Sequence, residues 1–96
     1  MSADLLDDGE IETALAALQW TRDGDEIVKT AERRDFAGSL AYVNEVGRLA
    51  EARNHHPDIA ISWNKVTLRL STHSAGGLTR SDMDLAAEID RIPDEP

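Results

Sequence analysis

The sequence has no cysteine and few aromatic residues: two Trp, one Tyr and one Phe. Without cysteine there is no disulfide, no thiolate zinc site and no cysteine nucleophile. No apolar run approaches the roughly 18 residues of a membrane-spanning helix, and the N-terminus lacks the basic and apolar blocks of a signal peptide. We therefore expect a cytoplasmic protein with a mostly aliphatic core.

Positive charge is scarce as well. Ten Lys and Arg side chains stand against nineteen Asp and Glu, which gives a formal net charge of −9. Because an acidic surface repels phosphate backbones, the composition argues against nucleic acid as a direct partner, and nothing in it indicates a membrane partner. The 96 residues are too few for two independent cores. We expect one domain over 1–96, with an ordered core at about 9–92.

The spacing of apolar residues changes several times along the chain and predicts both helices and strands. Asp7 and Glu10 form a capping-box pattern at the start of the first helix. The predicted elements are a helix over 9–18, short strands over 19–22 and 26–32 around a turn at Asp23-Gly24, a helix from an N-cap at Asp35 to about Asn54, two strands within 58–72, and a helix from a capping box at Thr79 and Asp82 to Pro93.

This order, α-β-β-α-β-β-α, predicts an α+β fold in which helices pack on one face of a four-stranded antiparallel sheet. The long helix is expected to bury an apolar stripe made of Phe36, Leu40, Val43, Val46 and Ala50. In the last helix, one face is shared by Asp82, Leu85, Ala86, Ile89 and Ile92.

The last two strands alternate apolar and polar residues, which sets a register. A turn at Asn64-Lys65 would pair Trp63 with Val66, and the next apolar pairs would fall on the same face of the sheet. Continued in the same way, this register sets His56 opposite His73, about 5 Å apart at Cα. The spacing therefore predicts that histidines from a helix end and from a strand end meet.

Histidine is suited to proton transfer near neutral pH, but each position also has a structural explanation. His55 and His56 could complement a helix C-terminus, and His73 could be a surface residue. Asp82 could cap a helix or orient an imidazole. Trp63 fits a core position, while Trp20 could form the wall of a pocket for a flat ligand.

A zinc site on the three histidines is disfavoured, because adjacent side chains do not easily reach one ion. Ser71, Ser74 and Ser81 lie nearby, but none sits in the strand–turn–helix elbow of a serine hydrolase. Gly76-Gly77 lacks the lysine and the spacing of a phosphate loop.

The spaced motif formed by these residues resembles the signature of the pterin-4a-carbinolamine dehydratases. Its positions are Glu51, His55, His56, Pro57, Trp63, His73 and Asp82, and the resemblance covers most of the chain. It implies helices on a four-stranded antiparallel sheet. It also implies the dehydration of a 4a-hydroxytetrahydropterin, such as 4a-hydroxytetrahydrobiopterin, to the quinonoid dihydropterin, without a metal or an organic cofactor. Such enzymes recycle the pterin of aromatic amino-acid hydroxylases, and a hydroxylase is an expected partner.

The resemblance implies a role for each position. His55 and His73 would exchange protons with the substrate, with acid and base left unassigned. His56 would belong to the same catalytic group and orient the pterin. Pro57, Trp20 and Asp82 would contribute to substrate binding, and Glu51 and Trp63 would support the site.

Three positions depart from the family pattern. Ala31 and Arg33 stand where aromatic residues are usual, and Ser81 stands where an arginine is frequent. The changes at Ala31 and Arg33 motivate an alternative, a non-catalytic binding or regulatory module that acts through protein partners. In either case a small sheet with an edge strand favours a homodimer or a homotetramer.

Overall fold

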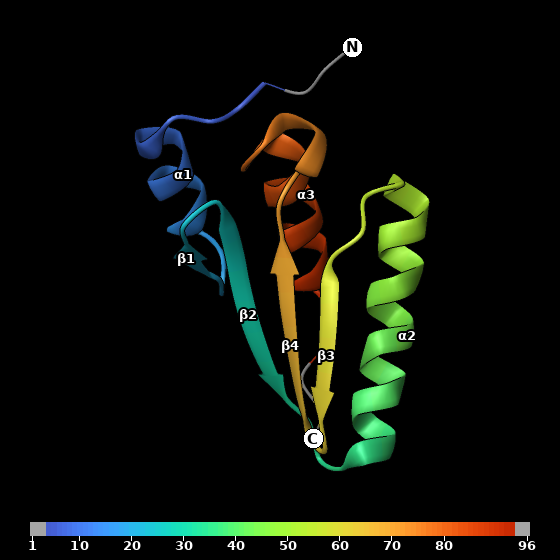
Figure 1. Ribbon diagram of the computed structural model, residues 1–96. Helices are drawn as coiled ribbons and strands as arrows, with labels where there is room; N and C mark the ends of the chain where they lie inside the picture. Colours follow the sequence, from blue (N-terminus) through green and yellow to red (C-terminus); the bar gives the residue numbers. More distant parts are fainter. Residues whose placement is uncertain (1–3, 94–96) are drawn as a thin grey trace.

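The computed structural model describes residues 4–93 and shows three helices against one four-stranded antiparallel sheet (Figure 1). The strand order in the sheet is β1-β2-β4-β3. The predicted α+β class and element order are confirmed, with one short 3-10 helix added after β4. The elements are α1 (Asp8–Leu15), β1 (Thr21–Asp23), β2 (Glu26–Glu32), α2 (Phe36–Arg53), β3 (Asp58–Ser62), β4 (Lys65–Leu70), η1 (His73–Ala75) and α3 (Arg80–Ile89).

The core is aliphatic at its centre and lies between the inner strands and the helices. Ile27 of β2, Leu68 and Leu70 of β4, and Leu85 and Ile89 of α3 have no exposed surface. Because α3 repeats its apolar residues at helical spacing, one face of it lies against the sheet. The buried face of α3 agrees with the sequence prediction.

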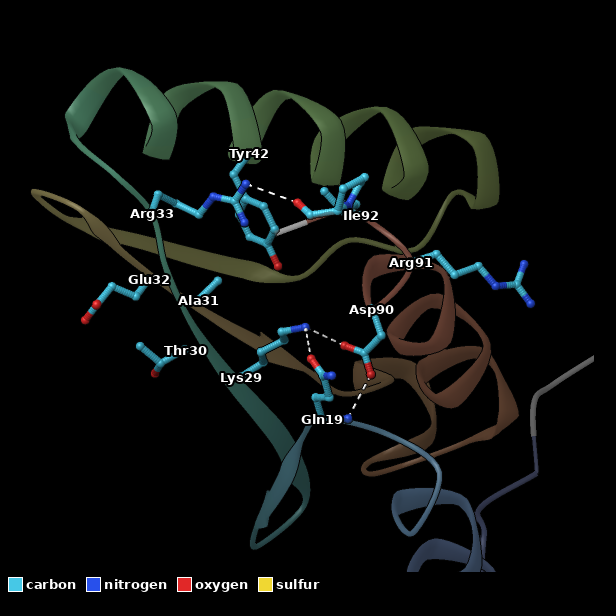
Figure 2. A pocket seen from close by; sticks show the side chains of 11 residues that line it. Gln19, Lys29, Thr30, Ala31, Glu32, Arg33, Tyr42, Asp90, Arg91 and Ile92 are labelled. Atoms are coloured by element: carbon cyan, nitrogen blue, oxygen red, sulfur yellow. Dashed lines mark hydrogen bonds and ion pairs between the residues drawn. The ribbon is translucent and has the colours of Figure 1, made fainter. Parts of the chain in front are cut away.

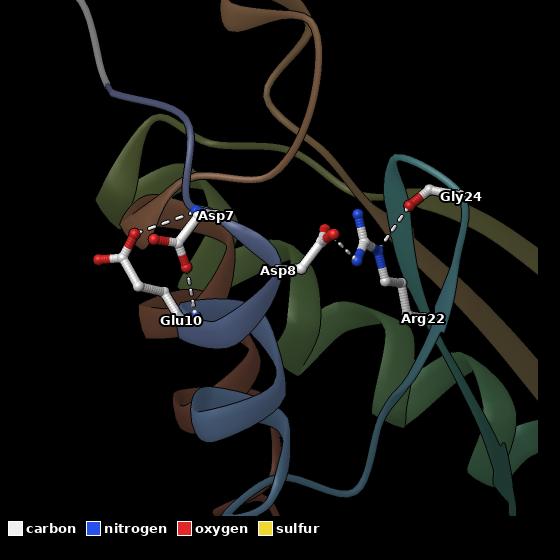
Figure 3. Close-up of polar contacts among 5 residues, drawn as sticks. All are labelled: Asp7, Asp8, Glu10, Arg22 and Gly24. Carbon is white, nitrogen blue, oxygen red and sulfur yellow. Dashed lines mark hydrogen bonds and ion pairs between the residues drawn. The ribbon is translucent and has the colours of Figure 1, made fainter.

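The first helix is joined to the β1–β2 hairpin by polar contacts (Figure 3). The predicted capping box forms, since the Glu10 amide donates to Asp7 Oδ1 at 2.8 Å and the Asp7 amide donates to Glu10 Oε1 at 3.0 Å. Arg22 of β1 donates to Asp8 Oδ1 at 2.9 Å. In the hairpin turn, Gly24 has φ of 64°, which a residue without a side chain adopts at little cost.

Two boundaries near the N-terminus differ from the prediction. α1 ends at Leu15 instead of 18, because the chain tightens into turns with i to i−3 bonds such as Leu18 N to Leu15 O at 3.0 Å. β1 begins at Thr21 instead of 19. Of the residues beyond the predicted ordered core of about 9–92, those at 1–3 and 94–96 lie outside the described residues.

The predicted apolar stripe of α2 is partly wrong. Phe36 is 49% exposed and Leu40 is 44% exposed, whereas Ser39 and Tyr42 are buried together with Val46 and Ala50. α2 packs against α3 and β4, and its N-terminal half turns Ser39 and Tyr42 inward. Ser39 Oγ donates to the carbonyl of Trp63 at 2.7 Å, which satisfies its hydroxyl.

The predicted β3–β4 register is also wrong, by two residues. The tight turn is at Trp63-Asn64, so Ile61 lies opposite Val66 and Ile59 lies opposite Leu68. A shift of two residues keeps every side chain on its face of the sheet, so the apolar pattern could not distinguish the two registers. Pairing ends at Asp58 and Arg69, and the predicted direct pairing of His56 with His73 does not form.

Candidate active site

The C-terminus of α2 determines where the adjacent histidines lie. Asn54 takes the left-handed conformation, with φ of 50°, and the His55 amide donates back to the Ala50 carbonyl at 3.1 Å. This arrangement ends the helix and turns the chain away from its axis. Pro57 then leads into β3. His55 and His56 therefore lie at the end of the sheet where β3 begins, β4 ends and α3 starts (Figure 1).

His55 is bound to a fully buried carboxylate. Its Nε2 lies 2.6 Å from Asp82 Oδ1, where Asp82 has no exposed surface and the His55 side chain is 16% exposed. Asp82 stands in the first turn of α3, where its Oδ2 also accepts from the Thr79 amide at 2.9 Å. The prediction left open whether Asp82 caps a helix or orients an imidazole; in the structure it does both.

A threonine hydroxyl reaches the same carboxylate. Thr72, just after β4, donates from Oγ1 to Asp82 Oδ2 at 2.8 Å, and Thr79 Oγ1 lies 2.7 Å from Thr72 Oγ1. Both threonines are buried. Asp82 therefore joins the α2–β3 connection, the end of β4 and the start of α3.

His56 pairs with a different carboxylate on the surface. Its Nε2 contacts Glu51 Oε2 on the last turn of α2. Both side chains are more than half exposed, so this contact lies in water and is accessible to a ligand. Glu51 thus contacts His56, whereas Asp82 contacts His55.

His73 is exposed and begins η1. It directly follows Thr72, so the backbone that carries His73 also carries a hydroxyl bound to Asp82. The chain then turns back at Gly76, which has φ of 77°, and Thr72 forms an isolated bridge to Gly77. His73 follows β4, and the His55-His56 pair precedes β3. Because β3 and β4 are antiparallel neighbours, all three histidines lie at the same end of the sheet.

The two tryptophans lie elsewhere. Trp63 is 67% exposed at the β3–β4 turn, at the opposite end of β3 from His55. Trp20 is buried, and its Nε1 donates to Asp90 Oδ1 at 2.9 Å just past the end of α3, away from Asp82 in the first turn. The structure does not bring either tryptophan to the histidines.

Asp90 is the centre of a separate polar cluster beside a cavity of about 320 Å³ (Figure 2). Lys29 Nζ lies 2.6 Å from Asp90 Oδ1, and the Gln19 amide donates to Asp90 Oδ2 at 2.8 Å. Arg33 lies over the ring of Tyr42, 4.8 Å from its centre. No histidine lines this cavity. Arg33 and the buried Ala31, both departures from the family pattern, pack within their own chain.

Within residues 4–93, no three His, Asp or Glu side chains converge in a way that could hold a metal ion. In the same range, none of the helices combines the length and the hydropathy needed to cross a membrane. What the site does offer is two imidazole–carboxylate pairs, one mostly buried and one exposed, with a third imidazole, His73, at the same end of the sheet. Such groups can donate and accept protons.

Sequence reasoning did not assign Thr72 and Thr79 to the site. Thr79 was recognisable as part of a capping box with Asp82, and Thr72 directly precedes His73. Neither signal indicates that the two hydroxyls meet, because that contact needs the end of β4 against the start of α3.

Comparison with known proteins gives a family match over most of the chain. Residues 4–92 match the family model described as "Pterin 4 alpha carbinolamine dehydratase". A protein of Roseiflexus castenholzii is 58% identical over 91 residues, which cover 94% of this chain and 98% of that protein. One of Nocardia farcinica is 52% identical, with 96% and 98% covered. Both carry the name "Putative pterin-4-alpha-carbinolamine dehydratase".

Two solved structures share the fold. A protein of Brucella melitensis, described as a transcriptional coactivator/pterin dehydratase, superimposes with a TM-score of 0.85 at 28% identity, covering 90% of this chain and 95% of that one. A pterin dehydratase-like protein identified as a RuBisCO assembly factor in the alpha-carboxysome superimposes with a TM-score of 0.60 at 19% identity, covering 76% and 84%. The second likeness concerns the fold alone.

Proposed function

The chain belongs to the pterin-4α-carbinolamine dehydratase family, and from this premise we propose that it dehydrates a 4a-hydroxytetrahydropterin. In this reaction the bond from C4a to the hydroxyl breaks, the oxygen takes a proton and leaves as water, and N5 loses its proton. The electrons of the N5–H bond form the C4a–N5 double bond of the quinonoid dihydropterin. One group must therefore donate a proton and another must accept one.

The hydrogen bond between His55 and the buried Asp82 is the observation that carries this proposal. A carboxylate on one ring nitrogen holds the imidazole in a fixed orientation, and it stabilises the positive charge that forms when the other nitrogen takes a proton. His55 is therefore our candidate for one proton transfer, with His73 as the second group. Which of the two is the acid stays open.

His56 and Pro57 are proposed to bind and orient the pterin. The His56–Glu51 pair is exposed beside the connection between α2 and β3, where a ring with hydrogen-bond donors and acceptors can reach both side chains. Pro57 restricts the backbone next to it. We also propose that the reaction needs neither a metal ion nor an organic cofactor.

The proposal is tested by mixing the purified protein with freshly generated 4a-hydroxytetrahydropterin and following the absorbance of the product. We expect acceleration over buffer, and a loss of about 10²–10⁴-fold in His55→Gln and in His73→Gln. Lys65→Gln, at the far end of β4, is the matched control and should keep full activity. A folded wild-type protein that does not exceed the buffer rate would contradict the proposal.

A second candidate function is a binding module on the same fold. It is favoured by the exposed apolar residues at the β3 edge and on α2, namely Phe36, Leu40, Ile59, Ile61 and Trp63. A protein partner, such as an aromatic amino-acid hydroxylase, recovered equally by wild type, His55→Gln and His73→Gln, together with no pterin turnover, would select this function over the enzyme.

We also propose that two or four copies associate. β3 is an edge strand whose five residues are all exposed, so a second copy can extend the sheet across a two-fold axis. The cytoplasmic location stays a prediction, which fractionation of the source cells would test.

A further inference from the structure

Two buried threonine hydroxyls are linked in series to the carboxylate of the His55–Asp82 pair. Thr72 is 8% exposed and Thr79 is 1% exposed. Thr79 Oγ1, Thr72 Oγ1 and Asp82 Oδ2 follow one another at 2.7 Å and 2.8 Å, and Asp82 Oδ1 then meets His55 Nε2 at 2.6 Å. We call this series of four side chains the hydroxyl chain.

The chemistry of the groups gives the hydroxyl chain a direction. A carboxylate only accepts hydrogen bonds, and a threonine hydroxyl has a single proton to donate. Thr72 gives its proton to Asp82, so Thr79 must be the donor to Thr72. Asp82 likewise requires a proton on Nε2 of His55. Nδ1 is then the ring nitrogen that can take up or release a proton.

Capping of α3 does not account for Thr72. The cap is complete with Thr79 and Asp82, through the Thr79 amide at 2.9 Å from Asp82 Oδ2. Thr72 comes from the end of β4, yet its hydroxyl is directed at the same oxygen. It also directly precedes His73, so its position affects both histidines proposed for proton transfer.

We propose that Thr72 and Thr79 are positioning residues which, through Asp82, keep the proton of neutral His55 on Nε2 and so leave Nδ1 as its exchanging nitrogen. Without the Thr72 hydroxyl, Oδ2 loses a donor and the carboxylate can rotate. His55 then distributes between its two tautomers. The effect on turnover rests on the proposed dehydratase activity, whereas the tautomer of His55 does not.

The test is ¹⁵N NMR of histidine-labelled protein at a pH where the imidazoles are neutral, with His55 assigned by its loss in His55→Gln. In wild type we expect a protonated Nε2 and an unprotonated Nδ1. Thr72→Val keeps the shape of the side chain without its hydroxyl and should give averaged shifts, while Thr72→Ser should restore the wild-type pattern. Thr67→Val, also on β4 but paired with Thr30 away from the site, should change nothing.

A wild-type tautomer of His55 in folded Thr72→Val would overturn the proposal, as would a Thr72→Ser protein that is not restored. If Thr72→Val does not fold, Thr79→Val and Thr79→Ser provide a second comparison, because the Thr79 amide still donates to Asp82 Oδ2 in both variants. In that pair too, an unchanged tautomer in Thr79→Val would count against the hydroxyl chain.

Kinetics give an independent readout of positioning. Because His55 is proposed to act in proton transfer, Thr72→Val should lower kcat about tenfold to hundredfold, the loss expected for one hydrogen bond to a charged group, with KM nearly unchanged. The pH profile of kcat should shift in Thr72→Val and not in Thr67→Val. A wild type that lacks dehydratase activity but shows the expected tautomer changes would refute the proposed function and leave the hydroxyl chain standing.

Discussion

Asp90 illustrates how one residue can stabilise the fold away from the site. Its carboxylate accepts from the Gln19 amide and from Trp20 Nε1, and it pairs with Lys29 at 2.6 Å. Only 12% of the Lys29 side chain and 14% of the Asp90 side chain are exposed. Removing one partner of a mostly buried pair leaves the other charge without compensation.

We therefore expect Asp90→Ala to lower the free energy of unfolding by about 3–5 kcal/mol, measured by urea denaturation. Asp8→Ala is the control, because it breaks the exposed Asp8–Arg22 pair and should cost less than about 1 kcal/mol. Equal losses in the two variants would show that Asp90 is not a buried anchor.

Trp63, in contrast, affects stability more through its backbone conformation than through its side chain. It has φ of 51°, a left-handed conformation that is costly for any residue with a side chain. Its indole is largely exposed, so removing it loses little packing within the chain.

We predict that Trp63→Gly is more stable than Trp63→Ala by about 1 kcal/mol, because both variants lack the indole and only glycine relieves the backbone. Thermal and urea unfolding of the two proteins provide the comparison. A more stable alanine variant would mean that the turn does not hold a left-handed residue 63 in solution.

At the scale of elements, α2 and α3 are linked across their surfaces by Arg53 and Glu88. Arg53 Nε donates to Glu88 Oε2 at 2.7 Å. This hydrogen bond, chiefly, lowers the pKa of Glu88 below its ordinary value of 4.5, and the positive charge of Arg53 acts in the same direction. A carboxyl whose pKa is lower in the folded state stabilises the fold above its ordinary pKa and loses that contribution as the pH falls through the folded value.

We expect Glu88→Gln to be less stable than wild type at pH 7, with a difference that disappears on acidification below about 4.5. A double-mutant cycle with Arg53→Gln isolates the pair, and its coupling should also weaken in high salt. A coupling that stays constant from pH 7 to pH 3 would contradict the assignment.

At the scale of the whole molecule, the unpaired strand β3 and the apolar residues beside it form a surface suited to a second copy. Ile59 and Ile61 are 39% and 37% exposed on this edge. A lysine introduced on such an edge strand would oppose edge-to-edge pairing with a second copy. Because each chain carries a net charge of −9, copies also repel one another at low ionic strength.

Light scattering after size exclusion should therefore show a multiple of the chain mass for wild type, and a single chain for Ile61→Lys. Thr30→Lys, at an exposed position of the inner strand β2, is the matched control and should assemble normally. Higher salt should shift a partly dissociated sample towards the assembly. A wild type that runs as one chain at every concentration would contradict self-association.

The amino-acid sequence alone determined the order of the elements, the face that α3 buries and the capping boxes at Asp7 and Thr79. These features are local, because they depend on residues a few positions apart in the chain. The motif of three histidines, Pro57 and Asp82 indicated the family for the same reason, since it can be recognised without knowing where its members lie in space.

Tertiary structure decided the rest. The two candidate registers of β3 and β4 put the same side chains on the same face, so the apolar pattern could not separate them, and the structure places the turn at Trp63-Asn64. The exposure of Phe36 and Leu40 depends on where α2 lies relative to the edge of the sheet. Asp82 meets His55 and Thr72 because the ends of α2 and β4 lie against the start of α3. Such contacts join residues distant in sequence, and local patterns carry no information about them.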